Sequence, residues 1–311
     1  VLLTDGRYAE AEARFDEAIG ETPGNFVLYR LRGNCRLERG RYPEAAADLR
    51  KAVALNARDW TSRVLHARAL YLVGQGQAAR ESLRAYHQLI EGDAPPETDF
   101  EVRYEIYRYS RLLNDTEAAL ADLEGACPLV PTNVVCRTEL GSLYYTLGQP
   151  EQAVTELDAV LAAPAATPAV RGDALFYRGM IAKQREQHEL ARRYLAESLE
   201  LKPSRTDALL NYGNTLRALG EEEEARRVLE RFEQAARIEK EMKLLTDRLL
   251  LDPSEREARV DLIGLLVDLE RWGEAREHLD ELRRRHPGDA AVPDLEARIP
   301  PRRASTTDRR R

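Results

Sequence analysis

Small and large apolar residues recur along this chain at a nearly fixed distance. An alanine returns after 34 and 34 residues, and then after 40, 34, 38, 34 and 50 residues. The alanines of this series are Ala11, Ala45, Ala79, Ala119, Ala153, Ala191, Ala225 and Ala275. Each is followed four positions later by a large apolar residue, and seven positions later by a further residue that is often small. Spacings of four and three place all three residues on one face of a helix, so the pattern predicts one amphipathic helix per period.

A second helix in each period is predicted upstream of the alanine. About five residues before the alanine, most periods have a residue that readily adopts positive φ and so ends a helix. These residues are Gly6, Gly40, Gly74, Asn114, Gly148 and Gly220. The centre of the upstream helix carries a small residue, at Gly33, Ala67, Gly141, Gly179 and Gly213. Because a glycine inside a helix costs up to about 1 kcal/mol relative to alanine, its recurrence predicts a close approach between helices.

Stretches such as LYRLRGNCRLERGRYPEAAADLRKAVALNA and ALLNYGNTLRALGEEEEARRVLERF resemble tetratricopeptide repeats, which are helix-turn-helix units of 34 residues. The resemblance extends from Thr4 to about Asp289 and implies an all-α, right-handed superhelical solenoid. The expected organisation is a truncated first repeat that keeps only its second helix (1–25), six units within 26–237 (26–59, 60–93, 100–133, 134–167, 172–205 and 206–237), an extended or extra helix (238–255), a final unit (256–289) and a Pro/Arg-rich disordered tail (290–311). Tyr107 and Ile263 replace the small central residue, so altered packing angles are expected in their two units.

Three insertions interrupt the period. The segments near 94–99 and 163–171 contain prolines and are predicted to be loops. The largest insertion lies within 221–252, which contains neither glycine nor proline. Ile238 and Met242 begin an apolar stripe there at helical spacing. Two alternatives fit this segment, a separate third helix or one long continuous helix, and we favour the long helix.

The charge balance and hydropathy exclude some partners. The net charge is −7, and the Arg-rich last ten residues leave the rest of the chain at about −11, which argues against nucleic acid. No apolar stretch approaches the roughly 20 residues needed to cross a bilayer, so membrane insertion is not expected. The chain begins inside a repeat, so its true N-terminus is expected to be missing. A cytoplasmic location is slightly favoured, and a periplasmic or secreted one is the alternative because a targeting segment would lie in the missing part.

Cysteines and histidines offer no metal site. Cys127 and Cys136 flank one short connection between helices, so a disulfide between them is one alternative. The favoured alternative is that these two cysteines and Cys35 are buried free thiols. Neither Cys-x-x-Cys nor His-Glu-x-x-His is present. The five histidines are scattered, and no glycine-rich phosphate loop follows a strand. The sequence therefore predicts no enzyme activity, no catalytic residue, no cofactor and no metal.

The resemblance implies a concave surface lined by the first helix of each unit, which would hold a partner protein or an extended peptide. It assigns groove-facing positions to Arg30, Asn34, Arg68, Tyr71, Tyr104, Arg108, Arg111, Ser142, Tyr145, Phe176, Tyr177, Asn211 and Asn214. Tyr and Arg are the residues that dominate interface hot spots. Arg68, Arg108 and Arg111 are expected to make the centre cationic and to favour an acidic segment. The alternative interpretation of single positions is a solvated helix face.

Two functions follow from this interpretation. The first is a non-catalytic scaffold that binds proteins or peptides in the groove. The alternative is a regulatory or substrate-recruiting module of a larger enzyme or envelope assembly, of which this chain would be a fragment.

Overall fold

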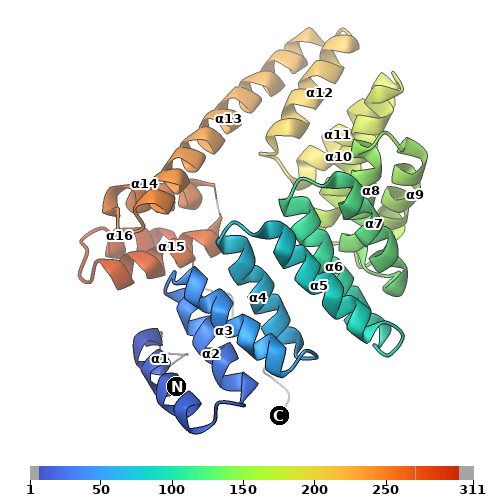
Figure 1. The fold of residues 1–311 in the computed structure, drawn as a ribbon. Helices are drawn as coiled ribbons and strands as arrows, with labels where there is room; N and C mark the ends of the chain where they lie inside the picture. Colours follow the sequence, from blue (N-terminus) through green and yellow to red (C-terminus); the bar gives the residue numbers. More distant parts are fainter. Residues whose placement is uncertain (1–6, 270, 301–311) are drawn as a thin grey trace, which may run out of the picture. The chain divides into compact units, whose positions relative to one another are not determined.

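The computed structural model describes residues 7–269 and 271–300 (Figure 1). Within these ranges the chain forms sixteen α-helices, one 3-10 helix and no β-strand. The helices are α1 (Tyr8–Glu21), α2 (Phe26–Glu38), α3 (Tyr42–Leu55), α4 (Trp60–Leu72), α5 (Gly76–Ile90), α6 (Pro96–Leu112), α7 (Thr116–Ala126), η1 (Cys127–Leu129), α8 (Val134–Thr146), α9 (Pro150–Ala162), α10 (Pro168–Gln184), α11 (His188–Leu201), α12 (Thr206–Ala218), α13 (Glu222–Leu251), α14 (Arg256–Asp268), α15 (Trp272–Arg285) and α16 (Val292–Arg298). The predicted all-α repeat solenoid is confirmed.

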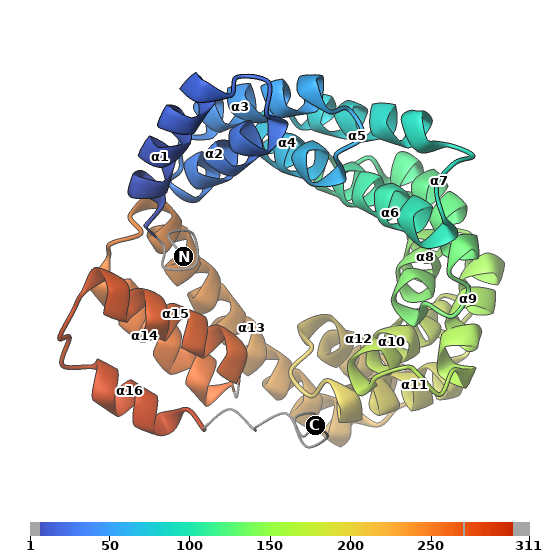
Figure 2. The same ribbon diagram turned by 90° about the horizontal axis from the view of Figure 1, so that it is seen from below.

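The helices fall into two compact units. Unit 1 covers Val1–Leu201 and contains α1 to α11, and unit 2 covers Lys202–Arg311 and contains α12 to α16. In unit 1 the helices α2 to α11 form five successive hairpins, and the second helix of each hairpin also packs against the first helix of the next. Figure 2 shows that the first helices, α2, α4, α6, α8 and α10, lie on the inner side of the arc of unit 1. Unit 1 therefore has a concave face made of first helices.

The turns inside the hairpins have the backbone conformation that the breakers predict. Gly40, Gly74, Gly148 and Gly220 have φ between +72° and +81°, and Asn114 has φ of +56°. Gly6 lies outside the described residues. The equivalent turn between α10 and α11 is made by Glu186, with φ of +57°. Its side chain gave no sign of this conformation, so the position was not predicted.

The small residues at the centres of the first helices allow the close approach that was predicted. A Cβ atom built on Gly33, Gly141, Gly179 or Gly213 would lie 2.7 to 2.8 Å from a side-chain carbon of a leucine in the paired helix. Those partners are Leu49, Leu157, Leu195 and Leu229, the large apolar residues that follow the periodic alanines by four positions. The alanines themselves are at most 2% exposed. The periodic residues therefore form the contacts that hold each hairpin together.

Two of the insertions are not the loops that were predicted. Pro96 and Pro168 are the first residues of α6 and α10, each of which has 17 residues. Proline fits the first helical turn because its fixed φ is already helical. The N–H group that it lacks would have no intrahelical partner at this position. The prolines therefore extend the following helix, and only the residues before them form a connection.

The third insertion is one continuous helix, α13, of 30 residues. Its C-terminal half carries Leu245 and Leu249 into a buried cluster with α14. The same cluster includes Leu295 and Ile299 at the end of the described chain. Residues 290–300 were assigned to a disordered tail, and this was wrong, because α16 and the residue that follows it supply Leu295 and Ile299 to the core of unit 2. Residues 301–311, the rest of that tail, lie outside the described residues.

The connection between α7 and α8 is closed by a disulfide between Cys127 and Cys136. The preference for free thiols was therefore wrong at these two positions. The turn after α7 brings the two Cα atoms to 5.8 Å, which is inside the normal range for a bridge. Cys35 is buried and free, as expected.

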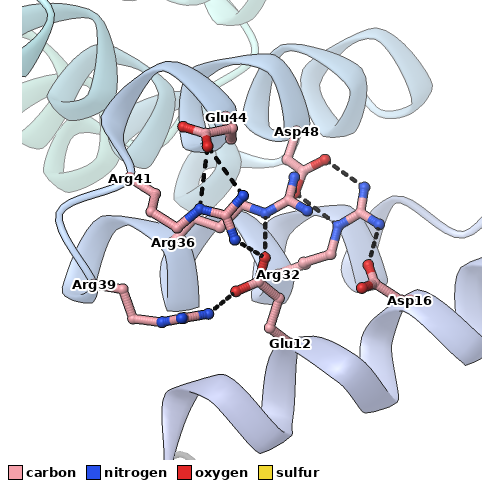
Figure 3. A network of polar contacts seen from close by, with 8 residues as sticks. All are labelled: Glu12, Asp16, Arg32, Arg36, Arg39, Arg41, Glu44 and Asp48. Carbon is pink, nitrogen blue, oxygen red and sulfur yellow. Dashed lines mark hydrogen bonds and ion pairs between the residues drawn. The ribbon is translucent and has the colours of Figure 1, made fainter.

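A cluster of eight charged side chains joins the first three helices of unit 1 (Figure 3). Its members are Glu12, Asp16, Arg32, Arg36, Arg39, Arg41, Glu44 and Asp48. Glu12 on α1 and Asp48 on α3 are each about 5% exposed. Arg36 on α2 lies between them and donates to both, with N–O distances of 2.8 Å. Because both buried carboxylates are matched by guanidinium groups, the cluster fastens α1 to the hairpin that follows it.

Candidate partner-binding groove

The inner face of unit 1 gathers aromatic and charged side chains between α6 and α8. Tyr104 donates a hydrogen bond to Glu139 Oε2 at 2.6 Å. Arg111 Nη1 donates to the Tyr107 hydroxyl at 3.0 Å. The rings of Tyr104 and Tyr107 lie 5.4 Å apart. One helix therefore supplies two tyrosines and an arginine that surround the carboxylate of the next first helix.

Burial raises the pKa values of the acidic groups in this cluster. Burial raises the pKa of Glu139, and hydrogen bonds from Tyr104 and Tyr107, together with Arg111, oppose the rise without cancelling it. Burial and the nearby Glu139 raise the pKa of Tyr107 to about 12. Burial also raises the pKa of Tyr104, and the hydrogen bond to Glu139 raises it further. Both tyrosines therefore keep their protons at neutral pH and remain hydrogen-bond donors.

Two hollows lie between successive first helices. One, of about 290 Å³, is lined by Tyr107, Arg108, Arg111 and Leu112 of α6 and by Glu139 of α8. The other, of about 180 Å³, has Arg111, Ser142 and Tyr177 in its lining, from α6, α8 and α10. Arg111 borders both hollows. The two hollows thus follow one another across three first helices.

Several predicted groove residues come together here. Tyr145 and Tyr177 pack with ring centroids 5.8 Å apart, which joins α8 to α10. Tyr71 packs edge-on against Tyr109 at 5.9 Å, which joins α4 to α6, and it is 37% exposed. Phe176 is only 6% exposed and serves the core. An aromatic surface therefore runs over four successive first helices.

Other predicted positions have different surroundings. Arg30 donates to both carboxylate oxygens of Asp59 at 3.0 Å. Asp59 caps the start of α4, so Arg30 links α2 to α4. Asn34 is half-buried on α2. Asn211 and Asn214 lie on α12 and belong to unit 2.

Each arginine of the predicted cationic centre has a carboxyl group nearby, which reduces the positive charge expected there. Arg68 pairs with Glu38 at 3.3 Å, and Arg108 pairs with Glu105 at 2.8 Å. Arg111 borders the same hollow as Glu139, whose carboxyl group partly offsets its charge. Glu139 was missed, although Ser142, which follows it by three positions on the same helix face, was assigned to the groove.

The described part of the chain contains no group of three or more His, Cys, Asp or Glu side chains arranged to hold a metal ion. None of its helices combines the length and apolar character needed to cross a membrane. His87 contacts Asp99 at 2.7 Å, and Asp99 also accepts from Arg103, so this pair links α5 to α6.

The tetratricopeptide repeat family model matches residues 1–62, 138–197 and 178–237. These matches cover more than half of the chain. They leave out residues 63–137, where the insertion before α6 and the central Tyr107 depart from the repeat pattern. The chain belongs to the tetratricopeptide repeat family.

Solved structures of low sequence identity share the fold. A tetratricopeptide repeat protein from Parabacteroides merdae matches with a TM-score of 0.52 and 14% identity, over 88% of this chain and 98% of that one. YrrB, described as a tetratricopeptide repeat protein with an unusual peptide-binding site, matches with a TM-score of 0.50 and 19% identity, over 63% of this chain and 95% of that one. A comparison with curated proteins found no match. Tetratricopeptide repeats generally mediate contacts between proteins and are generally not catalytic.

Proposed function

We propose that this chain is a non-catalytic scaffold that binds a protein or extended peptide on the inner face of unit 1. The observation that carries the proposal is the continuity of the surface. Tyr71, Tyr104, Arg111, Tyr145 and Tyr177 follow one another over four first helices, with hollows between α6, α8 and α10. Rigid aromatic rings and guanidinium groups provide large contact area at a modest cost in entropy.

The chemistry of the surface suits an extended segment. Side chains of the segment would enter the two hollows, and its backbone would meet the Arg111 guanidinium and the Ser142 hydroxyl, which line them. Glu139 partly offsets Arg111. An acidic side chain in the partner would therefore gain little from net charge and more from direct contact with Arg108, which is 60% exposed. The peptide-binding site named for YrrB is consistent with this mode of binding.

Selection from a random peptide display library on the immobilised full chain tests the proposal. Peptides that are selected on the wild type should bind Arg108→Ala and Tyr145→Ala at least tenfold more weakly, because hot-spot truncations cost about 2 kcal/mol or more. Arg14→Ala on α1 and Tyr194→Ala on α11 are matched controls on second helices. They should leave the dissociation constant within twofold.

Two results would contradict the proposal. Selection that enriches no peptide would argue against a peptide-binding scaffold. Selected peptides that bind all four variants as tightly as the wild type would argue against this surface as the site.

A further inference from the structure

A second recess lies within unit 2, along the middle of α13. Figure 1 shows α12 beside the first part of α13 and α14 beside its last part. The start of α12 and the end of α14 both reach the middle of the long helix. Thr206 donates to Glu239 at 3.0 Å, and Arg271 Nη1 contacts the Met242 sulfur at 3.6 Å. Between these two contacts lies a cleft of about 580 Å³, which is within the usual range of about 300–1,000 Å³ for ligand pockets.

The floor of this cleft is the uncovered part of a helix-packing stripe. Ala235, Ile238, Met242, Leu245 and Leu249 follow one another at spacings of 3, 4, 3 and 4, so they share one face of α13. Leu245 and Leu249 are buried in a cluster with α14. The other three residues line the cleft and are half-buried. The stripe therefore continues beyond the end of α14 as a surface of the type that packs against a helix.

The rim of the cleft carries three arginines and two carboxylates, and most of these groups are paired. Arg205, Arg231 and Arg271 line it, together with the carboxylates of Asp207 and Glu239. Asp207 is paired with Arg205 at 2.7 Å, and Glu239 accepts the hydroxyl hydrogen bond of Thr206. Arg231 donates to the neutral backbone carbonyl of Pro203 at 3.2 Å. Arg271 is paired with Glu274, which lies outside the lining, at 2.6 Å. Arg231 is therefore the lining guanidinium that donates to a neutral acceptor.

We propose that this cleft binds an amphipathic helical segment of a partner protein, with apolar residues one turn apart and an acidic residue beside them. The apolar residues would cover Ile238 and Met242 where α14 ends, which is the helix-in-groove mode of recognition. The acidic residue would meet Arg231 at the rim. The Arg231 guanidinium disfavours the chain's own segment 301–311, which contains five arginines and one aspartate. All lining residues lie in unit 2, so the site is independent of the groove proposed for unit 1.

A display library of 14-residue helix-forming peptides tests the proposal on the full chain. Each member carries two Leu or Phe residues four positions apart, and a neighbouring position is Glu, Gln or Lys. Glu-containing members should be enriched over Lys-containing members on the wild type. Fluorescence anisotropy of a labelled, enriched Glu peptide then gives dissociation constants for the variants.

Matched variants on the same helix separate the site from general effects. Arg231→Glu and Ile238→Asn should weaken binding of the Glu peptide at least tenfold. Arg237 also donates to a backbone carbonyl, and Leu244 is 60% exposed, yet neither lines the cleft. Arg237→Glu and Leu244→Asn should therefore change the dissociation constant by less than twofold. Far-UV circular dichroism checks that every variant keeps its helices.

Several outcomes would overturn the proposal. One is enrichment of Lys-containing peptides over Glu-containing peptides. Another is that Ile238→Asn does not weaken binding of the Glu peptide. Ile238-dependent binding of a synthetic 301–311 peptide would make the chain's own tail the occupant. If the chain self-associates in sedimentation experiments and Ile238→Asn abolishes this association, the occupant of the cleft would be a second copy of the chain. Arg108→Ala on α6 should leave the Glu peptide unaffected, so failure here is distinguishable from failure of the unit 1 groove.

Discussion

At the scale of single residues, a positive φ recurs in the hairpin turns, and in one turn the residue that adopts it is a glutamate. Gly40, Gly74, Gly148 and Gly220 adopt positive φ without steric cost, whereas Glu186 adopts φ of +57° with a Cβ atom. A residue other than glycine in this region costs roughly 1–2 kcal/mol. The turn between α10 and α11 therefore stores strain that the four glycine turns lack.

Glu186→Gly should stabilise the protein by about 0.5–1 kcal/mol, which is less than the strain relieved because glycine is more flexible in the unfolded chain. Gly148→Ala, the reverse change in an equivalent turn, should destabilise it by about 1 kcal/mol. Midpoints of urea unfolding measure both effects. A lower midpoint for Glu186→Gly would contradict the interpretation of this turn.

The buried carboxyl of Glu139 predicts an unusual pH dependence. Because its folded pKa is raised, its contribution to stability is present below the unfolded value of about 4.3 and is lost as the pH rises through the folded pKa. Glu139→Gln should accordingly be more stable than the wild type at pH 7, and the two should converge below about pH 4. The glutamine oxygen can still accept from Tyr104. Urea unfolding at both pH values measures the difference, and equal stability at pH 7 would refute the assignment.

At the scale of elements, glycines in two of the first helices differ in what an added Cβ atom would meet. At Gly141, a Cβ atom would lie 2.8 Å from Leu157 Cγ, and Leu157 is fully buried. At Gly264 on α14, nothing lies within 4 Å of the same atom. The same substitution should therefore have opposite effects in the two helices.

Gly141→Ala should lower stability by about 1–3 kcal/mol, because the leucine has to move in a packed core. Gly264→Ala should raise stability by about 0.5–1 kcal/mol, because the helix loses only the flexibility of glycine. Thermal melting of both variants checks the signs. Two shifts in the same direction would show that close packing is not the reason for the glycine at 141.

The disulfide acts on the connection between α7 and α8. It closes a loop of about ten residues, so removing it should cost about 2–3 kcal/mol in the chain-entropy model. Cys127→Ser together with Cys136→Ser, or addition of a reductant, should lower the melting temperature and leave the helical content unchanged. The reductant should have no effect on the double variant. Thiol titration of the unfolded, unreduced protein should find one reactive thiol, Cys35, and a count of three would contradict the bridge.

At the scale of the whole molecule, stability comes from contacts between neighbouring helices, so a helix with a neighbour on only one side is held least. Among the described helices α1 packs on α2 alone. Burial raises the pKa of Glu12, but Arg36, Arg41 and Arg39 outweigh that effect and lower it. Glu12 therefore contributes stability above its unfolded pKa of about 4.3, and this contribution is lost as the pH falls through the lower folded value.

Glu12→Gln should weaken the attachment of α1 by about 1–3 kcal/mol, which is less than for a fully buried pair because Arg39 and Arg41 are partly exposed. Hydrogen exchange should accelerate in α1 first, both in this variant and in the wild type below about pH 4. Glu17→Gln, in an exposed pair on the same helix, is the control and should leave exchange unchanged. Uniform acceleration over all of unit 1 would contradict the local role of the cluster.

The periodic residues determined the repeat architecture without reference to the tertiary structure. The alanines, the leucines four positions later and the glycines of the turns each satisfy a requirement within one hairpin. Helical spacing and positive φ are local properties, so they are visible in the sequence. Prolines are ambiguous in the same local terms, because Pro96 both ends one segment and begins α6. This is why the inserted segments were wrongly predicted as loops.

The remaining features depend on distances between residues far apart in the chain, and only the tertiary structure decides them. The turn after α7 sets the separation of Cys127 and Cys136. Packing of α6 next to α8 buries Glu139 among tyrosines and places it on the same hollow as Arg111, which reduces the predicted positive charge. The end of α14 leaves part of the α13 stripe uncovered. Burial and charge pairing depend on every residue that lies near a side chain in space. The repeat pattern predicts which helices pack together, but it does not specify which side chains meet.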